Sequence, residues 1–327
     1  MSSGFDEAAL AAWLGATDLF VEGGPIGGGW SNETVFVRVD GRPMVVRLSP
    51  SGPSMFPAYD VGLQVRSLEL TAQAGLPVPG VVAFEASGSV LGRPFFVMKR
   101  LAGRVPADDD PPFTKAGFLF EAGPEQQARF CRHAVDLIAA VHAVAAPGFL
   151  PVGSSPRAHL EWCAGLCRWA AVDHVDLSVA YDALARDVPP DDAAPVGLLW
   201  GDARPANMVV DDQFRITGLL DWELAATGPG ELDVAWFLEM NRMRSVGMGI
   251  TALPGFLSDG DTWQRWSGSV GRSPTFVGWH HRYAAYRVAV LLFLYLRAMV
   301  TRGQLPNGHR LFQDNPGTRR LRELFTQ

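Results

Sequence analysis

The hydrophobic pattern of this chain changes character near residue 101, and that change limits the folds that the chain can adopt. Before it, short apolar stretches at residues 34–39, 44–48, 81–85 and 94–98 alternate with turn residues such as Asp40-Gly41, which is typical of strands. After it, apolar residues recur at helical spacing, most clearly over residues 125–144. The pattern predicts an α+β protein in which residues 1–101 and 102–327 form two lobes with a ligand-binding cleft between them.

Composition limits the functional classes. The chain has 327 residues, of which 48% are hydrophobic and 19% charged, and its formal net charge is −6. These values are typical of a folded globular protein and do not favour a nucleic-acid partner, which usually requires a basic surface. The most apolar stretch, residues 288–296, is too short to cross a bilayer, and the N-terminus lacks a signal-peptide pattern. We therefore expect a cytoplasmic protein with no membrane or nucleic-acid partner.

The three cysteines are Cys131, Cys163 and Cys167. Such a small, odd number does not suggest a disulfide framework and favours a reducing compartment. The i, i+4 spacing of Cys163 and Cys167 allows metal binding, but neighbouring residues read as an amphipathic helix, so we expect buried thiols.

A polar loop follows a short apolar strand at residues 198–200. It contains Asp202 and Asn207. Asp221 follows the apolar strand expected at residues 216–220. Phosphoryl transfer from ATP requires a carboxylate to accept the proton of the acceptor hydroxyl, and oxygen ligands that hold Mg²⁺ on the phosphates. These three residues supply such a set. The alternative is a surface turn, since Asp, Pro and Asn are common turn residues, but Asp221 and the later Asp233 weigh against it.

The pattern Asp-x-Arg-Pro-x-Asn from residue 202 matches the protein-kinase loop Asp-x-Lys-Pro-x-Asn. More specifically, residues 201–237 resemble the aminoglycoside phosphotransferase and choline kinase superfamily, whose loop reads His-Gly-Asp-x-x-x-x-Asn before an Ile-Asp-Trp-Glu-like strand. Trp200-Gly-Asp-Ala-Arg204 and Leu220-Asp-Trp-Glu-Leu-Ala225 are similar to the branch that includes kinase-like domains associated with acyl-CoA dehydrogenases. The resemblance runs from about residue 19 to residue 300.

The resemblance implies a two-lobed, protein-kinase-like fold. Residues 1–101 would form a nucleotide-binding lobe with a five-stranded antiparallel sheet, and residues 102–327 a helical lobe for catalysis and substrate binding. Asp202 would be the catalytic base, and Arg204 would contact the transferred phosphate. Asn207 and Asp221 would be ligands of Mg²⁺.

For each of two acidic residues near this loop, the sequence is compatible with two different roles. Asp233 either braces the catalytic loop or caps the helix that begins near residue 231. Glu223 either lies beside the metal or is a solvated side chain, and we slightly favour the second.

The glycine cluster at residues 27–29 precedes the first of the two hairpin strands. Glycine lets backbone N–H groups approach phosphate oxygens closely, although a plain turn is the commoner explanation of such a cluster. Here the cluster resembles the family's Gly-Gly-x-Ser-Asn loop, which implies that Gly28, Gly29, Ser31 and Asn32 cradle the phosphates of ATP.

The nucleotide-binding lobe departs from the family pattern at two positions. Arg47 stands where a kinase fold places the lysine that holds the α- and β-phosphates, and Gln64 stands where its partner glutamate is expected. Arginine retains the charge with a different geometry, so a weakened or missing ion pair is expected. The segment at residues 95–103 resembles the hinge between lobes, where backbone groups of Met98, Lys99 and Leu101 would bind adenine.

A third departure is Trp200, which replaces the family's histidine and can pack in its place. His142 reads as structural. His280 and His281 either face a substrate or are solvated at the start of a helix at 283–299. The Gly- and Ser-rich stretch at residues 247–273 predicts a loop or insertion.

The acceptor is the least defined part of the prediction. The C-terminal region has few acids and many arginine and aromatic residues, which favours an anionic or apolar acceptor over a polycationic aminoglycoside. The arginine and aromatic residues in question are Arg242, Arg244, Trp263, Arg265, Trp266, Trp279 and Arg282.

The sequence thus predicts a phosphotransferase that uses ATP and Mg²⁺ to phosphorylate a hydroxyl group of a small molecule, such as a hydroxyacyl thioester or another metabolite. The alternative is a pseudokinase-like regulatory module that binds a nucleotide without turnover, and Arg47, Gln64 and Trp200 are the features that support it. The sequence leaves a monomer and a homodimer equally open.

Overall fold

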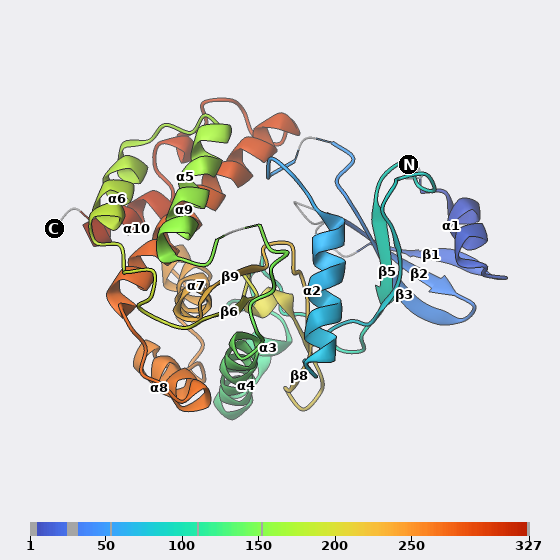
Figure 1. Ribbon diagram of the computed structural model, residues 1–327, viewed down its shortest axis with the longest axis horizontal. Coiled ribbons are helices and arrows are strands. Elements are labelled where there is room, and N and C mark those ends of the chain that lie inside the picture. The colour runs from blue at the N-terminus through green and yellow to red at the C-terminus, as the bar shows by residue number, and fades with distance from the viewer. Residues whose placement is uncertain (1–4, 25–31, 53, 110, 152, 326–327) are drawn as a thin grey trace.

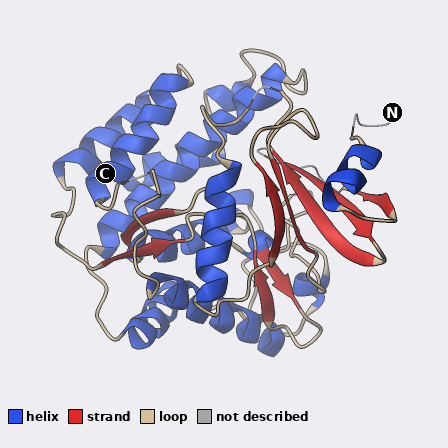
Figure 2. Ribbon diagram, turned by 45° about the vertical axis from the view of Figure 1, so that its right-hand side comes forward, coloured by secondary structure: helices blue, strands red, loops and turns tan. Residues whose placement is uncertain are grey.

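A five-stranded antiparallel sheet forms the N-terminal end of the molecule, and a mainly helical part follows (Figures 1 and 2). The computed structural model describes residues 5–24, 32–52, 54–109, 111–151 and 153–325. The strand order is β1-β2-β3-β5-β4. The strands are β1 (Leu19–Gly23), β2 (Glu33–Val39), β3 (Arg42–Leu48), β4 (Val81–Glu85) and β5 (Phe95–Lys99). The expected α+β class and antiparallel sheet are therefore confirmed.

The hairpin between β2 and β3 turns at Asp40-Gly41, as its sequence predicts. Val39 pairs with Arg42, and both turn residues have positive φ angles, 47° for Asp40 and 75° for Gly41. Two positive φ angles define the type I′ turn, whose twist matches that of the strands it joins. A short helix, α1 (Glu7–Leu14), covers this end of the sheet with the buried Leu10.

Helix α2 (Val61–Gln73) lies between the sheet and the helical part (Figure 1). Asp60 caps its N-terminus by accepting a hydrogen bond from the Leu63 N–H group at 2.9 Å. Its buried residues Leu63 and Leu68 belong to the same hydrophobic cluster as the helix α4 described next. The predicted helix at residues 60–74 is confirmed, and it joins the two parts of the molecule.

The helical part holds longer helices around two short two-stranded antiparallel sheets. The helices described are α3 (Phe118–Glu121), α4 (Pro124–His142), α5 (Pro156–Trp169), α6 (Val175–Arg186), α7 (Glu231–Met243), α8 (Asp259–Val270), α9 (Val277–Thr301) and α10 (Pro316–Phe325), with 3-10 turns η1 (Pro205–Asn207), η2 (Val246–Met248) and η3 (Arg310–Phe312). The strands pair as β6 (Val196–Leu199) with β9 (Ala226–Pro229), and β7 (Met208–Val210) with β8 (Ile216–Leu219).

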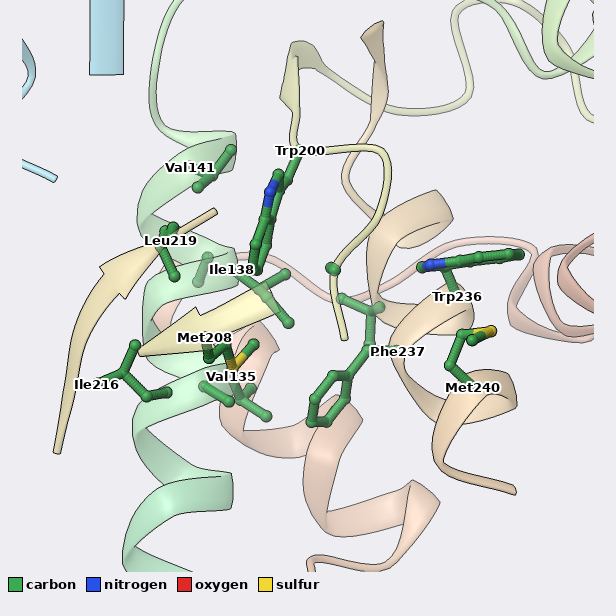
Figure 3. Close-up of a cluster of buried hydrophobic side chains, with 14 of the residues drawn as sticks. Val135, Ile138, Val141, Trp200, Met208, Ile216, Leu219, Trp236, Phe237 and Met240 are labelled. Carbon is green, nitrogen blue, oxygen red and sulfur yellow. The ribbon is translucent and has the colours of Figure 1, made fainter. Parts of the chain in front are cut away.

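The main core lies where α4, the β7–β8 hairpin and α7 meet. Figure 3 shows Val135, Ile138 and Val141 of α4 directed toward the hairpin residues Met208 and Leu219. These side chains are almost completely buried. Their spacing on α4 is that of one helix face, so the helical period read from the sequence identified the correct face.

The prediction of a loop at residues 247–273 is wrong for the second half of this stretch. Residues 259–270 form α8, which is capped by Ser258 and ended by Gly271 at a φ of 71°. Trp263 and Trp266 are buried on its inner side. Two glycines and two serines of α8, Gly260, Ser267, Gly268 and Ser269, lower the helical signal of the sequence, and the packing of the two indoles stabilises the helix.

Helix α9 is longer than the expected helix at 283–299. Its 25 residues, with a mean hydropathy of 1.5 over the most apolar window, make it the one described helix long and apolar enough to cross a membrane. That test depends on length and composition alone, and 61% of the window is buried within the protein. The packing of α9 against α7 and α10 is that of a core helix.

Two buried histidines, His159 on α5 and His280 on α9, predict how stability changes with pH. Burial lowers the pKa of each to about 4, below the ordinary value of 6.5. The unfolded chain therefore binds more protons than the folded chain between pH 6.5 and pH 4, so stability is complete above this window and decreases as the pH falls through it.

We expect the free energy of unfolding to fall by about 2 kcal/mol for each histidine between pH 7 and pH 5. Urea denaturation at both pH values would measure the loss in the wild type and in His280→Gln. The variant should lose less than the wild type on acidification. Equal losses in the two proteins would show that His280 is not held in its neutral form.

Candidate functional site

The polar loop from Trp200 to Asn207 is held in place by a close backbone approach. Gly201 has a φ of 83°, and a Cβ atom at this position would lie 1.8 Å from the carbonyl oxygen of Leu224. Glycine is therefore required where the loop passes the segment after β8. Asp221, at the end of β8, also has a positive φ of 59°, a conformation that Asp adopts more readily than most residues. Both backbone features bring Asp202 and Asp221 to the same region.

The carboxylate of Asp202 is fixed by donors on both oxygens. Its Oδ1 accepts a hydrogen bond from Trp236 Nε1 at 2.9 Å. Its Oδ2 accepts bonds from Asn207 Nδ2 and Arg204 Nε, each at 2.8 Å. The predicted catalytic pair Asp202 and Arg204 is thus brought into direct contact. The indole of Trp236 is a contact that the sequence motif did not indicate.

Asp233 braces the loop, which decides between its two interpretations. Its Oδ2 accepts a hydrogen bond from the Trp200 N–H group at 2.7 Å, and its Oδ1 accepts one from Gly201 N–H at 3.0 Å. Although Asp233 lies in the first turn of α7, its carboxylate binds the loop. Because it is buried and both bonds involve a charge, they are among the stronger kinds of hydrogen bond.

Trp200 fills the site of the expected histidine as a packed aromatic residue. It is fully buried, its ring lies 5.9 Å from that of Trp222, and its Nε1 donates to the carbonyl of Leu220 at 2.8 Å. Figure 3 shows it beside Val141 and Ile138. His142 is structural, as expected: its Nδ1 accepts a bond from Trp266 Nε1 at 2.9 Å, and its Nε2 lies 3.3 Å from Asp233.

The expected metal ligands come from adjacent segments, because the N–H group of Leu220, the residue before Asp221, donates to the carbonyl of Asn207 at 2.8 Å. Asn207 uses its amide N–H groups on Asp202, and Arg47 Nη2 forms an ion pair with Asp221 Oδ1 at 2.9 Å. One carboxylate and one carboxamide oxygen are hard ligands that suit Mg²⁺ when phosphates and water complete its shell. The residues thus fit the ion, although no group of three His, Cys, Asp or Glu side chains suitable for a metal occurs in the described parts of the chain.

The partner of Arg47 differs from the one that a kinase pattern suggests. Gln64 instead donates from Nε2 to Asn32 Oδ1 at 3.3 Å, while the Asn32 amide donates to Glu223. This chain links α2, the end of the glycine segment and the strand end beyond Asp221. The interpretation of Glu223 as merely a solvated side chain is therefore wrong. Gly28, Gly29 and Ser31 lie outside the described residues.

The hinge segment offers fewer free backbone groups than expected. The N–H group of Lys99 donates to Gly80 O at 2.9 Å, and that of Arg100 donates to Pro43 O at 3.3 Å. Met98 lies within β5, paired with Val45. Recognition of adenine by Met98, Lys99 and Leu101 remains a prediction, and its N–H donor would come from Leu101.

Sequence reasoning missed Asp108, which lies in the segment after the hinge. Its carboxylate accepts hydrogen bonds from Arg204 and from Arg244, the latter at 2.9 and 2.7 Å. Burial raises the pKa of Asp108, and the two arginine charges more than offset this, so that the pKa lies below its usual value. Arg204 is therefore shared between Asp202 and Asp108. No motif marks Asp108, and only the folded chain brings it to the loop.

The residues expected to favour an anionic acceptor do not form one set. Trp263, Trp266 and Trp279 are buried in the core, and Arg242, Arg265 and Arg282 pair with acids elsewhere. The solvated interpretation of His280 and His281 is also wrong, because His280 is 1% exposed and His281 accepts a bond from Trp263. Cys131 and Cys163 are buried as expected, while Cys167 is only partly buried; burial raises the pKa of Cys131 to about 11 and of Cys163 to about 12.

A cavity of about 340 Å³ opens beside the loop. Its walls come from residues 56–64, from α5, from residues 223–226 and from α9, and it reaches the loop at Gly201 and α7 at Asp233. Its size is within the range of small-molecule sites. A candidate acceptor site therefore lies beside Gly201, the residue that precedes Asp202 in the chain.

Asp233→Asn tests the brace. An amide can accept only one of the two backbone hydrogen bonds, so we expect the free energy of unfolding to fall by about 2–4 kcal/mol and the loop to lose its position. Asp259→Asn is the control, because Asp259 also lies in the first turn of a helix but is exposed. It should cost about 0.3–1 kcal/mol through the helix dipole alone. Equal losses in urea denaturation would mean that Asp233 acts only through its helix.

Known proteins with similar structures share this architecture. A protein from Ralstonia eutropha JMP134, described as a candidate aminoglycoside phosphotransferase, has a TM-score of 0.73 and 22% identity, with 98% of this chain and 96% of that chain covered. A thermostable mutant of the aminoglycoside phosphotransferase APH(4)-Ia, in a ternary complex with ADP and hygromycin B, has a TM-score of 0.59 and 16% identity. The match covers 98% of this chain and 97% of that chain. The protein thus has a two-lobed, kinase-like fold.

Sequence comparison gives a second group of relatives. Acyl-CoA dehydrogenase family member 11 of Gallus gallus is 28% identical over 223 residues, which are 64% of this chain and 26% of that protein. The probable acyl-CoA dehydrogenase IBR3 of Arabidopsis thaliana is 26% identical over 228 residues, 64% of this chain and 27% of that protein. The match therefore spans about a quarter of the length of these relatives.

The family itself is defined by a match that covers most of the chain. Residues 22–267 match the phosphotransferase enzyme family, and this range includes β2, β3, the loop with Asp202 and Asn207, and the strand end with Asp221. The chain therefore belongs to the phosphotransferase enzyme family.

Proposed function

We propose that this protein transfers the γ-phosphoryl group of ATP, with Mg²⁺, to a hydroxyl group of a small molecule. The observation that carries the proposal is the convergence of Asp202, Asn207, Asp221 and two arginines, Arg47 and Arg204, from segments far apart in sequence. Phosphoryl transfer depends on positioning and on stabilising negative charge, and this arrangement has groups for both tasks. The ADP complex of APH(4)-Ia supports the choice of an adenine nucleotide.

In the proposed reaction, the acceptor hydroxyl lies against Asp202 and attacks the γ-phosphorus in line. A new P–O bond forms to the acceptor as the bond to the bridging oxygen of ADP breaks, and Asp202 takes the hydroxyl proton. Trp236 and Asn207 hold the Asp202 carboxylate in position, and Arg204 places positive charge near the transferred group. Asn207 and Asp221 would hold Mg²⁺, which neutralises phosphate charge when bound.

The acceptor is a hydroxylated metabolite, with a hydroxyacyl compound as the leading candidate. The similarity to acyl-CoA dehydrogenase family members supports an acyl group. The mainly apolar wall of the cavity beside Gly201 supports it as well, because apolar walls favour an apolar ligand body.

A nucleotide-binding regulatory module remains the second candidate. The ion pair between Arg47 and Asp221 favours it, because this pair occupies one oxygen of a proposed metal ligand. For catalysis, Arg47 would have to exchange Asp221 for the phosphates. The module would bind ATP without releasing ADP in the presence of any hydroxyl-bearing acceptor.

Asp202→Asn tests the proton acceptor. Loss of a positioned general base typically lowers the rate by a factor of about 10²–10⁴, so ADP release with a hydroxyacyl acceptor should fall by that factor while ATP binding persists. Asp212→Asn is the matched control, because Asp212 lies in the exposed β7–β8 turn and should retain wild-type turnover. Wild-type turnover by Asp202→Asn would contradict the proposed role.

Asp221→Asn tests the metal ligand through binding rather than turnover. Titration calorimetry of ATP with and without Mg²⁺ should show that the metal strengthens binding to the wild type and has little effect on the variant. In the ADP-release assay, run in parallel, the wild type should be active with Mg²⁺ and lose activity when a chelator removes the metal. An unchanged metal effect in Asp221→Asn would exclude this residue as a ligand.

A further inference from the structure

The cavity beside the catalytic loop has an aromatic and aliphatic wall with one buried cation. The segment before α2 supplies Phe56 and Tyr59, and α5 supplies Trp162. Helix α9 supplies Tyr283 and Arg287 one turn apart. The cavity is therefore suited to a small ligand with a mainly apolar body.

Arg287 is 6% exposed and its guanidinium lies between two indole rings. Its Cζ atom is 4.3 Å from the Trp236 ring centroid and 5.6 Å from that of Trp162. Its Nη2 donates to the carbonyl of Gly201 at 2.7 Å. Its buried Nε has no hydrogen-bond partner, and no carboxylate lies within ion-pair distance of it, among the residues that the structure describes.

The acidic residues that line the same cavity are occupied by other donors. Asp233 binds the N–H groups of Trp200 and Gly201. Asp60 caps α2 and pairs with Arg66, and Glu223 accepts from the Asn32 amide. These contacts use carboxylates that a cationic ligand would need, whereas Arg287 keeps an unused donor.

A buried guanidinium without a carboxylate partner is costly, because an ion loses favourable hydration when it is removed from water. Contacts with two indoles and one carbonyl offset part of this penalty. An anion at Nε would offset more of it. Among anions, a carboxylate matches the planar fork of arginine with two parallel hydrogen bonds.

We propose that Arg287 binds a carboxylate of the acceptor, so that the acceptor is a hydroxy carboxylic acid with an apolar body. This inference rests on the proposed phosphotransferase function and narrows its acceptor from a hydroxyacyl compound to the free acid, since a thioester carries no charge at its carbonyl. Trp236 connects the two ends of the site: its Nε1 binds Asp202, and its ring contacts Arg287.

The first experiment measures binding without nucleotide. Hexanoate, hexanamide and hexylammonium have the same apolar body and differ in the charge of the head group. Titration calorimetry should show that wild-type protein binds hexanoate at least about tenfold more tightly than the other two, a difference of about 1.4 kcal/mol. Equal binding of hexanamide, or tighter binding of hexylammonium, would overturn the proposal.

Three variants assign this preference to Arg287. Arg287→Met removes the charge at similar length and should abolish the preference for hexanoate, while Arg287→Lys should retain part of it because the charge remains. Arg297→Met is the matched control, because Arg297 is an exposed arginine of the same helix, and it should bind all three probes as the wild type does. A preserved preference in Arg287→Met would overturn the proposal. If Arg287→Met unfolds, Arg287→Lys provides the test. Full wild-type preference for hexanoate in Arg287→Lys would contradict a carboxylate contact that uses two hydrogen bonds of the arginine.

ADP release distinguishes this inference from the function on which it rests. With hydroxy acids and their methyl esters as acceptors, wild type should have a lower KM for the acid, and Arg287→Lys should raise that KM with a smaller effect on kcat. Turnover of the esters with an equal KM would contradict carboxylate recognition and leave the phosphotransferase function intact. Preference for hexanoate without ADP release from any acceptor would contradict the phosphotransferase function and leave the anion site intact.

Discussion

The buried carboxylate of Asp233 is the interaction on which the candidate site depends. By accepting the N–H groups of Trp200 and Gly201, it ties the start of the polar loop to α7, and α7 in turn carries Trp236, the donor to Asp202. One helix therefore fixes the loop at two points. The close approach of Gly201 to Leu224 fixes it against the segment beyond Asp221. Together these constraints fix the backbone around Asp202 and Asp221, and the proposed electrostatic catalysis would depend on such fixed positions.

Arg47 and Arg204 carry positive charge beside the catalytic loop, and each has an acidic partner. Arg47 pairs with Asp221, and Arg204 is shared between Asp202 and Asp108. These partners offset the charge of the two arginines, which limits the cost of burying it. Binding of ATP would require phosphate oxygens to take over some of these contacts. The charge network thus links nucleotide binding to a rearrangement around Asp221 and Asp108.

Arg287 differs from these arginines because it lies in an apolar cavity and pairs with no acid of the described residues. The two indoles that contact it belong to α5 and α7, so elements on both sides of α9 create its environment. The expected preference for an anionic or apolar acceptor was based on other residues, and those residues are in the core or paired at the surface. The proposed carboxylate site assigns that preference instead to Arg287, which is not part of the motifs read from the sequence.

The sequence by itself determined the fold class, the antiparallel sheet and the membership of the loop residues in one motif. It could do so because strand alternation, the Asp40-Gly41 turn and the spacing of Asp202, Asn207 and Asp221 are local patterns. Helix α8 escaped prediction because two buried indoles, rather than a continuous apolar face, stabilise it. The roles of Asp108, Asp233 and Arg287 were decided only by tertiary structure. Their hydrogen-bond partners lie between 32 and 136 residues away, as with Asp233 and Gly201 at one extreme and Asp108 and Arg244 at the other. No local pattern encodes a contact between such distant segments.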